Sequence, residues 1–134
     1  MCVPEYATPG SACFDVRACL KFDPQTLLPG EIKKIGCGFQ IELPDLHRMM
    51  IVSRSGLASK GLIVANSPGI VDCDYRGEIC VLLRNVSELP LTIHNGDRIA
   101  QSWIEPYQKV NFNLVTRLSE TQRKNRGFGS TGTQ

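Results

Sequence analysis

Hydrophobic residues occupy every second position in several short stretches of this chain, and turn-forming residues separate the stretches. The first is CFDVRACL, residues 13–20, in which Phe14, Val16, Ala18 and Leu20 share one face. A period of two is typical of a β-strand that buries one face and exposes the other. This stretch is therefore predicted to be a half-buried strand.

Five further stretches rich in aliphatic and aromatic residues are also predicted to be strands. They are IKKIGCGFQIEL (32–43), RMMIVS (48–53), EICVLLRN (78–85), LTIH (91–94) and RIAQSWIE (98–105). Pairs such as Pro29-Gly30 and Asn95-Gly96 mark turns between them. Only RSGLASKG, residues 54–61, is predicted to form a brief helix. Many short strands with frequent turns indicate an all-β barrel or sandwich.

Length and charge narrow the class of protein. The chain has 134 residues, which suggests one domain. Its formal net charge of +2 is too balanced to predict a nucleic-acid surface. The sequence has no apolar run of about 18 residues, so we expect no membrane span. The first residues lack the basic and apolar regions of a secretory signal, so we expect a cytoplasmic protein, or a nuclear one if its source is eukaryotic or viral.

Six cysteines suggest three alternatives, which are disulfides, a metal site or a nucleophile. Without a secretory signal, reduced thiols packed as small core residues are expected. The sequence has no Cys-x-x-Cys pair, and its two histidines, His47 and His94, are far apart, which argues against structural zinc. No cysteine has a histidine near it in sequence, so a thiolate nucleophile is not favoured. The cysteines are Cys2, Cys13, Cys19, Cys37, Cys73 and Cys80.

The segment NSPGIVDCDYRGEI, residues 66–79, is the first of several that could carry chemistry. Asp72 follows an apolar pair at a predicted strand end, where a carboxylate can take a proton from water. Tyr75, three residues on, can pack its ring against a flat or cyclic ligand. Composition alone favours a plainer interpretation, a β-hairpin whose acidic turn faces water.

A second segment has an anion-binding interpretation and a structural one. In residues 53–62, Arg54 offers a fork of donors suited to phosphate, and Ser55 and Gly56 open the brief helix. The alternative is a helix cap with a solvated arginine. Asp15 lies on the face of its strand opposite the apolar residues, where a solvated carboxylate is the default.

The segments near the C-terminus allow two interpretations each. In NGDRIAQSWI, residues 95–104, Gln101 is a neutral donor, whereas a plain hairpin would make Asp97 and Arg98 a structural pair. RGFGSTGTQ, residues 126–134, is either a flexible tail or a phosphate-binding loop.

Five stretches, in this order and with these spacings, resemble the five ordered motifs of the trimeric dUTP nucleotidohydrolases, the dUTPases. They are GSACFDVRA (10–18), RSGLASKGL (54–62), GIVDCDYRGEI (69–79), GDRIAQ (96–101) and RGFGSTG (126–132). The last three are highly specific, and the resemblance covers almost the whole chain.

The resemblance implies a jelly-roll β-barrel with one short helix. Residues 1–117 would form the barrel, and residues 118–134 a flexible C-terminal arm that closes a neighbouring subunit's active site. The chain would form a homotrimer with sites shared between subunits. Its substrate would be dUTP, which water attacks at the α-phosphorus with the help of Mg²⁺. The products would be dUMP and diphosphate, which limits uracil in DNA and supplies dUMP for dTMP synthesis.

The resemblance also assigns roles to residues around the base and sugar. Asp72 matches the carboxylate that activates the attacking water. Tyr75 matches the aromatic residue under the deoxyribose, where a ribose 2′-hydroxyl would collide with it. The residues that match the uracil-binding hairpin are Asn66, Gly69, Ile70 and Val71 at its entrance and Cys80 on its far side, which would act through backbone groups.

Other matching residues face the triphosphate. Asp15 resembles the acidic residue that reaches Mg²⁺ through water, while the ion itself lies on the triphosphate. In the arm, Phe128 would stack over uracil and Arg123 would clamp the terminal phosphate. The remaining phosphate-facing residues are Arg54, Ser55, Gly56 and Gln101 in the barrel, and Gly129 and Ser130 in the arm.

Three positions depart from the family pattern. Cys13, Lys124 and Arg126 stand where family members commonly have glycine. The two basic residues add positive charge near a polyphosphate, so we expect salt-sensitive substrate binding. Two alternatives remain open, which are a dCTP deaminase of the same fold and a regulatory binding protein built on it.

Overall fold

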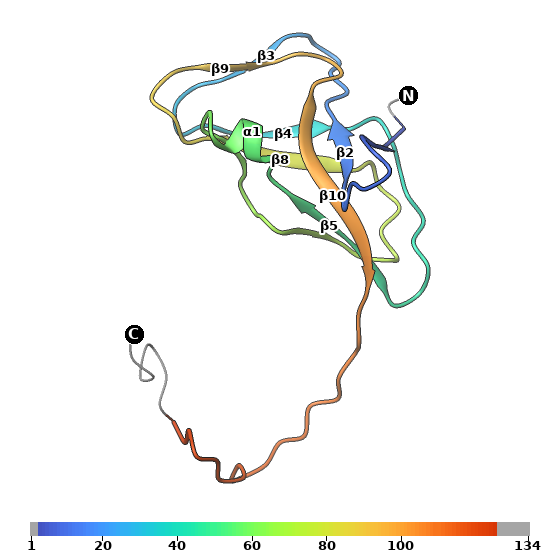
Figure 1. Cartoon of the computed structure of the whole chain (residues 1–134), viewed down its shortest axis with the longest axis vertical. Coiled ribbons are helices and arrows are strands. Elements are labelled where there is room, and N and C mark those ends of the chain that lie inside the picture. The colour runs from blue at the N-terminus through green and yellow to red at the C-terminus, as the bar shows by residue number, and fades with distance from the viewer. Residues whose placement is uncertain (1–2, 126–134) are drawn as a thin grey trace.

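Short β-strands make up most of the regular structure in the computed structural model, which describes residues 3–125 (Figure 1). The one helix is α1 (Ser55–Ala58). The strands are β1 (Glu5–Tyr6), β2 (Phe14–Arg17), β3 (Gln25–Leu27), β4 (Ile32–Gly36), β5 (His47–Val52), β6 (Leu62–Val64), β7 (Gly69–Val71), β8 (Cys80–Asn85), β9 (Leu91–Ile93) and β10 (Arg98–Pro106). The predicted all-β class with one short helix is confirmed.

The strands form three antiparallel sheets of jelly-roll type. One has five strands in the order β1-β2-β10-β5-β7, one has three in the order β4-β8-β6, and β3 pairs with β9. The long strand β10 lies between β2 and β5, so it connects segments that are far apart in sequence (Figure 1). In this register Gln101 faces Asp15 on one side and Val52 on the other.

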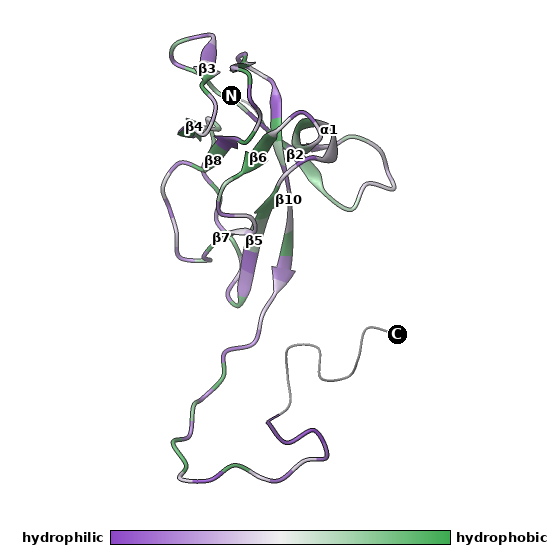
Figure 2. Cartoon of the chain, turned by 90° about the vertical axis from the view of Figure 1, so that its left-hand side faces the viewer, coloured by the Kyte–Doolittle hydropathy of each residue, from purple (hydrophilic) through white to green (hydrophobic). Residues whose placement is uncertain are grey.

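The period of two in residues 13–20 corresponds to the buried face of β2. Phe14, Val16 and Ala18 are at most 6% exposed, whereas Leu20 lies beyond the strand end and is only half-buried. These side chains join one core to which both larger sheets contribute. Green, hydrophobic stretches are visible along β5, β6 and β10 in Figure 2. Other fully buried members of this core are Leu27, Met49, Ile79, Leu83, Ile93 and Ile99.

Glycines end two elements earlier than the sequence predicts. The predicted strand 32–43 stops at Gly36, and Gly38 has a φ of 71°, a left-handed conformation that does not continue a strand. The predicted helix 54–61 is a single turn, and Gly61 follows it with a φ of 88°.

The strand pairing differs from two predicted hairpins. β7 pairs with β5, and β8 pairs with β4 and β6, so the acidic segment 72–79 connects two sheets rather than closing a hairpin. β9 and β10 likewise belong to different sheets. Turn residues predict where the chain bends, but burial across the whole barrel decides which strands pair.

The chain leaves the barrel after β10, and residues 107–125 contain no helix or strand (Figure 1). Apolar side chains of this segment are exposed, including Phe112 at 94% and Leu114 at 103%. The predicted boundary between residues 117 and 118 stays a prediction. Phe128, Gly129 and Ser130 lie outside the described residues. Among residues 3–125, no helix is long and apolar enough to span a membrane.

Candidate active site

Most of the site residues predicted in the barrel line one of two pockets that have no lining residue in common. The first, of about 450 Å³, lies between β2, β10 and α1. Its polar or small lining residues are Ser11, Cys13, Asp15, Arg54, Ser55, Gly56, Arg98 and Gln101. The structure thus brings together three sequence segments that are separated by up to 86 positions, between Asp15 and Gln101.

Asp15 is the electrostatic centre of this first pocket. One carboxylate oxygen lies 2.9 Å from Arg54 Nε, and the other lies 3.3 Å from Arg98 Nη1. Arg54 also donates from Nη1 to the main-chain oxygen of Arg98, at 3.0 Å. The Asp15 side chain is only 14% exposed, so it holds both guanidinium groups at the pocket.

The structural pair expected between Asp97 and Arg98 is wrong. Asp97 instead accepts a hydrogen bond from the His94 N–H at 2.8 Å, which closes the turn before β10. Arg98 is free to pair with Asp15 because a register shift follows it: β10 is irregular between Arg98 and Ala100. Such a bulge re-aims side chains, and it places Arg98 in the same pocket as Gln101.

The start of α1 forms another wall of the first pocket. Arg54 has an extended backbone and makes no side-chain cap, so the first N–H groups of the helix are available to an anion. A Cβ added at Gly56 would meet nothing within 4 Å, so packing inside this chain does not explain the glycine. The close approach of a ligand to the backbone would explain it.

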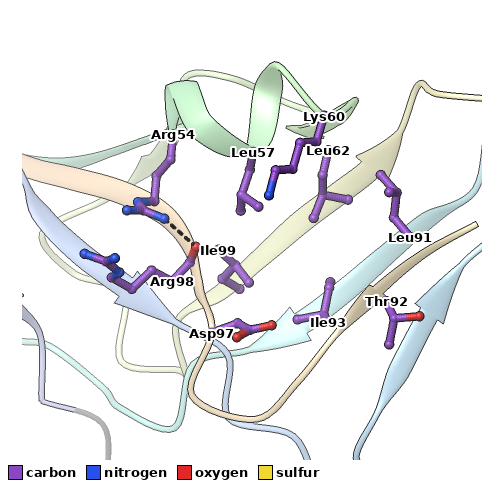
Figure 3. A pocket seen from close by; sticks show the side chains of 10 residues that line it. All are labelled: Arg54, Leu57, Lys60, Leu62, Leu91, Thr92, Ile93, Asp97, Arg98 and Ile99. Carbon is purple, nitrogen blue, oxygen red and sulfur yellow. Dashed lines mark hydrogen bonds between the residues drawn. The ribbon is translucent and has the colours of Figure 1, made fainter.

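A neighbouring pocket lies beside Arg54 and Arg98, and Figure 3 shows both side chains at its edge. Its volume is about 370 Å³. The rest of its lining is mainly apolar: Leu57, Leu62, Leu91, Ile93 and Ile99. Lys60 and Asp97 add charge to it. The sequence analysis attached no function to this pocket.

The second predicted group surrounds a pocket of about 200 Å³ between β7 and β8. Its lining residues are Ile70, Val71, Asp72, Tyr75, Glu78, Ile79 and Cys80. Gly69 and Asn66 stand just before it: Gly69 is buried, and a Cβ there would lie 3.4 Å from the Asn66 amide nitrogen. Arg123 lies in the segment after β10, outside both pockets.

Asp72 is an exposed carboxylate at the end of β7. None of the ion pairs found among residues 3–125 involves it. Its main-chain oxygen accepts the Tyr75 N–H at 3.1 Å, which closes the turn between the two residues. A carboxylate without a cationic partner among the described residues is available to accept a proton.

The thiol of Cys80, beside this pocket, is held in its neutral form. Burial, and then the negative charge of Glu78, raise the pKa of Cys80, against a smaller opposing effect of Lys34. A neutral thiol is a poor nucleophile. Cys80 therefore contributes shape and backbone groups to the pocket.

Tyr107 contacts the Asp72 loop and was missed by sequence reasoning. Its hydroxyl lies 3.9 Å from Cys73 Sγ, and this contact is the main cause that raises the pKa of Tyr107, followed by burial and the charges of Cys73, Asp72 and Asp74. Arg98 and Glu78 were missed as well. Arg98 reaches its pocket because of the bulge in β10, and Glu78 reaches its pocket because residues 72–79 connect two sheets. No local sequence pattern marks either feature.

The sequence of this chain is similar to those of named proteins. The family model described as dUTPase matches residues 1–132. A deoxyuridine 5'-triphosphate nucleotidohydrolase of Desulfotalea psychrophila is 46% identical over 131 residues, which is 97% of this chain and 87% of that protein. The protein of the same name from Caulobacter vibrioides is 48% identical over 132 residues, with coverage of 97% and 85%.

Solved structures show the same fold at lower identity. A dUTPase variant of Staphylococcus bacteriophage 80alpha, solved with dUpNHpp, superposes with a TM-score of 0.86 at 23% identity and covers 97% of this chain and 91% of that one. A variant dUTPase from phage phi11 of S. aureus, whose structure describes a structural Mg(II) ion, has a TM-score of 0.76 at 21% identity, with coverage of 87% and 91%.

Proposed function

This chain belongs to the dUTPase family and is an enzyme that hydrolyses dUTP, and from that premise we propose how its residues divide the reaction. The observation that carries the proposal is the exposed Asp72 carboxylate, unpaired with any cation of residues 3–125, on the rim of the pocket that Tyr75 lines. The two pockets have separate tasks. The pocket of Asp72 and Tyr75 binds uracil and the deoxyribose and supplies the general base. The pocket of Asp15, Arg54 and Arg98 binds phosphate.

Asp72 acts as the general base. It accepts a proton from a water molecule whose oxygen bonds to the α-phosphorus. The bond from the α-phosphorus to the bridging oxygen breaks, and its electron pair leaves with diphosphate, so dUMP and diphosphate result. Phosphoryl transfer of this kind depends on positioning and on neutralisation of charge, and needs no covalent nucleophile.

Arg54 and Arg98 neutralise the charge that develops on the phosphate oxygens. Asp15 orients both guanidinium groups through the 2.9 Å and 3.3 Å contacts. Gln101 and the first N–H groups of α1 add neutral donors. Donors that are fixed before the substrate arrives stabilise the transition state most effectively.

The smaller pocket selects the nucleoside. Uracil binds to backbone groups of Ile70, Val71 and Cys80, and Tyr75 packs against the deoxyribose. A ribose 2′-hydroxyl would collide with the Tyr75 ring. Such a pocket rejects cytosine through its donor pattern and thymine through lack of room for the methyl group.

The donor set fits a Mg²⁺ ion that the substrate carries. In the described part of the chain, no three His, Cys, Asp or Glu side chains group together to hold a metal. Asp15 is the single carboxylate among the residues that line the first pocket, between β2, β10 and α1, called here the arginine pocket. Asp15 would contact such an ion through its water shell, and the ion would neutralise phosphate oxygens.

The active site is completed between subunits of a homotrimer. The separation of the two pockets within one chain supports this, because neither pocket alone has both the base catalyst and the arginines. The C-terminal arm, with Arg123 and with Phe128, Gly129 and Ser130, closes over the nucleotide of a neighbouring subunit.

Release of diphosphate from dUTP in the presence of Mg²⁺ tests the assignment of Asp72. Asp72→Asn keeps the size of the side chain and removes the base, so kcat should fall about 10²–10⁴-fold, the usual contribution of a general base. KM should change little. Release of ammonia from dCTP, measured in parallel, should be absent. A variant as fast as the wild type would show that Asp72 is not the base.

A further inference from the structure

Tyr75 is held by two hydrogen bonds, one at its main chain and one at the hydroxyl end of its ring. Its main-chain N–H donates to the Asp72 oxygen at 3.1 Å, and its hydroxyl donates to the Glu78 main-chain oxygen at 3.0 Å. The ring therefore extends along its own loop toward residue 78. The 46% exposure of Tyr75 leaves part of the ring available to a ligand.

A side chain at residue 77 would overlap this ring. An ideal Cβ at Gly77 would collide with the Tyr75 hydroxyl oxygen and would lie only 2.6 Å from Cζ and 3.1 Å from Cε2. Contacts below 3.0 Å essentially never occur for a real Cβ. Gly77 is not among the described glycines with positive φ, so a side chain added there would act by displacing the Tyr75 ring and not by straining the backbone.

The Arg76 side chain binds main-chain oxygens of the same loop. Its Nη1 donates to the main-chain oxygens of Cys73, at 2.7 Å, and Tyr75, at 3.1 Å. Its Nη2 lies 3.4 Å from a Glu42 carboxylate oxygen. The Gln40 side chain in turn donates to the Arg76 main-chain oxygen at 2.9 Å. The segment before β5 thus braces the loop that carries Asp72 and Tyr75.

We propose that Gly77 and Arg76 are positioning residues that set the discrimination between deoxyribose and ribose. The inference rests on the proposed role of Tyr75 at the sugar. A ring fixed by the Glu78 hydrogen bond, the space at Gly77 and the Arg76 clamp excludes a 2′-hydroxyl. A ring that can tilt leaves room for one. The two residues act through Tyr75 and do not touch the substrate themselves.

A double-mutant cycle between Gly77 and Tyr75 tests this mechanism. kcat/KM is measured for dUTP and UTP with the wild type, Gly77→Ala, Tyr75→Ala and the double variant. In the wild-type background, Gly77→Ala should lower the ratio of the dUTP to the UTP value about tenfold, within the range that one steric contact can discriminate. In the Tyr75→Ala background it should change that ratio less than about twofold, because coupled residues are not additive.

Two results would overturn the inference. One is an equal fall of kcat/KM for dUTP and for UTP in Gly77→Ala, which would indicate that the glycine has a purely structural role. The other is the same change of ratio in both backgrounds, which indicates that Gly77 does not act through Tyr75. A wild type without activity on dUTP would instead refute the proposed function, so the two failures are distinguishable.

Arg76 provides a second test that does not depend on how Gly77→Ala folds. Arg76→Ala should lower the dUTP to UTP ratio several-fold, and Arg76→Lys, which keeps one donor group, should lie between it and the wild type. Arg84→Ala is the matched control, because Arg84 is an exposed arginine on β8, the strand that follows this loop. If Arg76→Ala and Arg84→Ala give the same ratio, Arg76 does not position the ring.

Discussion

At the scale of single residues, the site depends on which charges are paired and which are left free. Asp15 is paired with two arginines, whereas Asp72 has no cationic partner in the described chain. The carboxylate of Asp15 within β2 and that of Asp72 after β7 therefore differ in their surroundings. In the proposed function, the first would organise positive charge for the phosphates, and the second would accept a proton.

Arg98 should be as important for phosphate binding as Arg54. Arg98→Ala removes one of two cations from the arginine pocket, so KM for dUTP should rise about tenfold or more, the effect of losing a charged hydrogen bond. Its kcat/KM should also depend less on salt concentration than that of the wild type. Steady-state rates at low and high salt measure both effects. An unchanged KM would remove Arg98 from the site.

Glu105 should contribute to stability in a pH-dependent way. Its carboxylate accepts a hydrogen bond from Trp103 Nε1 at 2.7 Å and two from Arg48, at 3.0 Å and 2.8 Å. The Trp103 hydrogen bond, and then those from Arg48, lower the pKa of Glu105 below its ordinary value of 4.5. The pKa is lower in the folded state, so the stabilisation is fully present above pH 4.5 and is lost as the pH falls through the folded pKa.

Glu105→Gln tests this expectation through thermal unfolding at a series of pH values. Wild type should have the higher Tm at pH 6 to 7, roughly two units above the ordinary glutamate pKa. The difference in Tm should shrink as the pH falls through the acidic range. A difference that stays constant with pH would show that the carboxylate charge is not involved.

At the scale of elements, buried polar contacts join strands too short to hold together alone. Asn85, at the end of β8, is fully buried and donates to the main-chain oxygens of Leu27 and Leu89, at 3.0 Å and 2.7 Å. Its amide oxygen accepts bonds from both the N–H and the hydroxyl of Ser87. One side chain therefore connects β8, β3 and the turn that leads to β9.

Replacement of Asn85 should be strongly destabilising. Asn85→Ala removes four hydrogen bonds made by one fully buried side chain, including the buried bond to the Leu27 oxygen, so the free energy of unfolding should fall by about 2–4 kcal/mol. Arg84→Ala, next to it but exposed, should change stability by no more than about 0.5 kcal/mol. Urea denaturation compares the two variants. Equal effects would mean that water replaces the Asn85 hydrogen bonds.

Sequence patterns predicted the longer elements better than the short ones. β2, β5, β8 and β10 fall within or close to their predicted ranges because each is long enough to show alternation or, in β5, a continuous apolar run. β1, β3 and β6 have two or three residues, too few to show a period, and the sequence analysis missed them. The bulge beside Arg98 was also invisible, because it exists only relative to the partner strand.

At the scale of the whole molecule, residues 3–125 place most of the site residues predicted in the barrel in two separate pockets. Asp72 and Tyr75 line one pocket, and Arg54 and Arg98 line another. The segment after β10 exposes apolar residues such as Phe112 that find no place in its own barrel. Both observations favour an assembly in which neighbouring subunits supply the missing parts.

Mixed trimers should show complementation between inactive variants. Asp72→Asn and Arg54→Ala chains, denatured and refolded together in equal amounts, should recover roughly a quarter of wild-type activity, because random assortment places both intact groups at one site in one case of four. Each variant refolded alone should stay nearly inactive. Absence of recovery, with trimers present by sedimentation, would place both groups in a single subunit's site.

The sequence by itself determined the all-β class, the short helix and the family, because alternation, turn residues and ordered motifs are local properties of the chain. It also named Asp72, Tyr75, Arg54 and Gln101 as candidates. Only the tertiary structure decided that Asp15 holds Arg54 and Arg98, and that Gly77 leaves space for the Tyr75 ring. Those contacts depend on strand pairing and on a bulge, which are set by packing over the whole barrel and leave no local signal in the sequence.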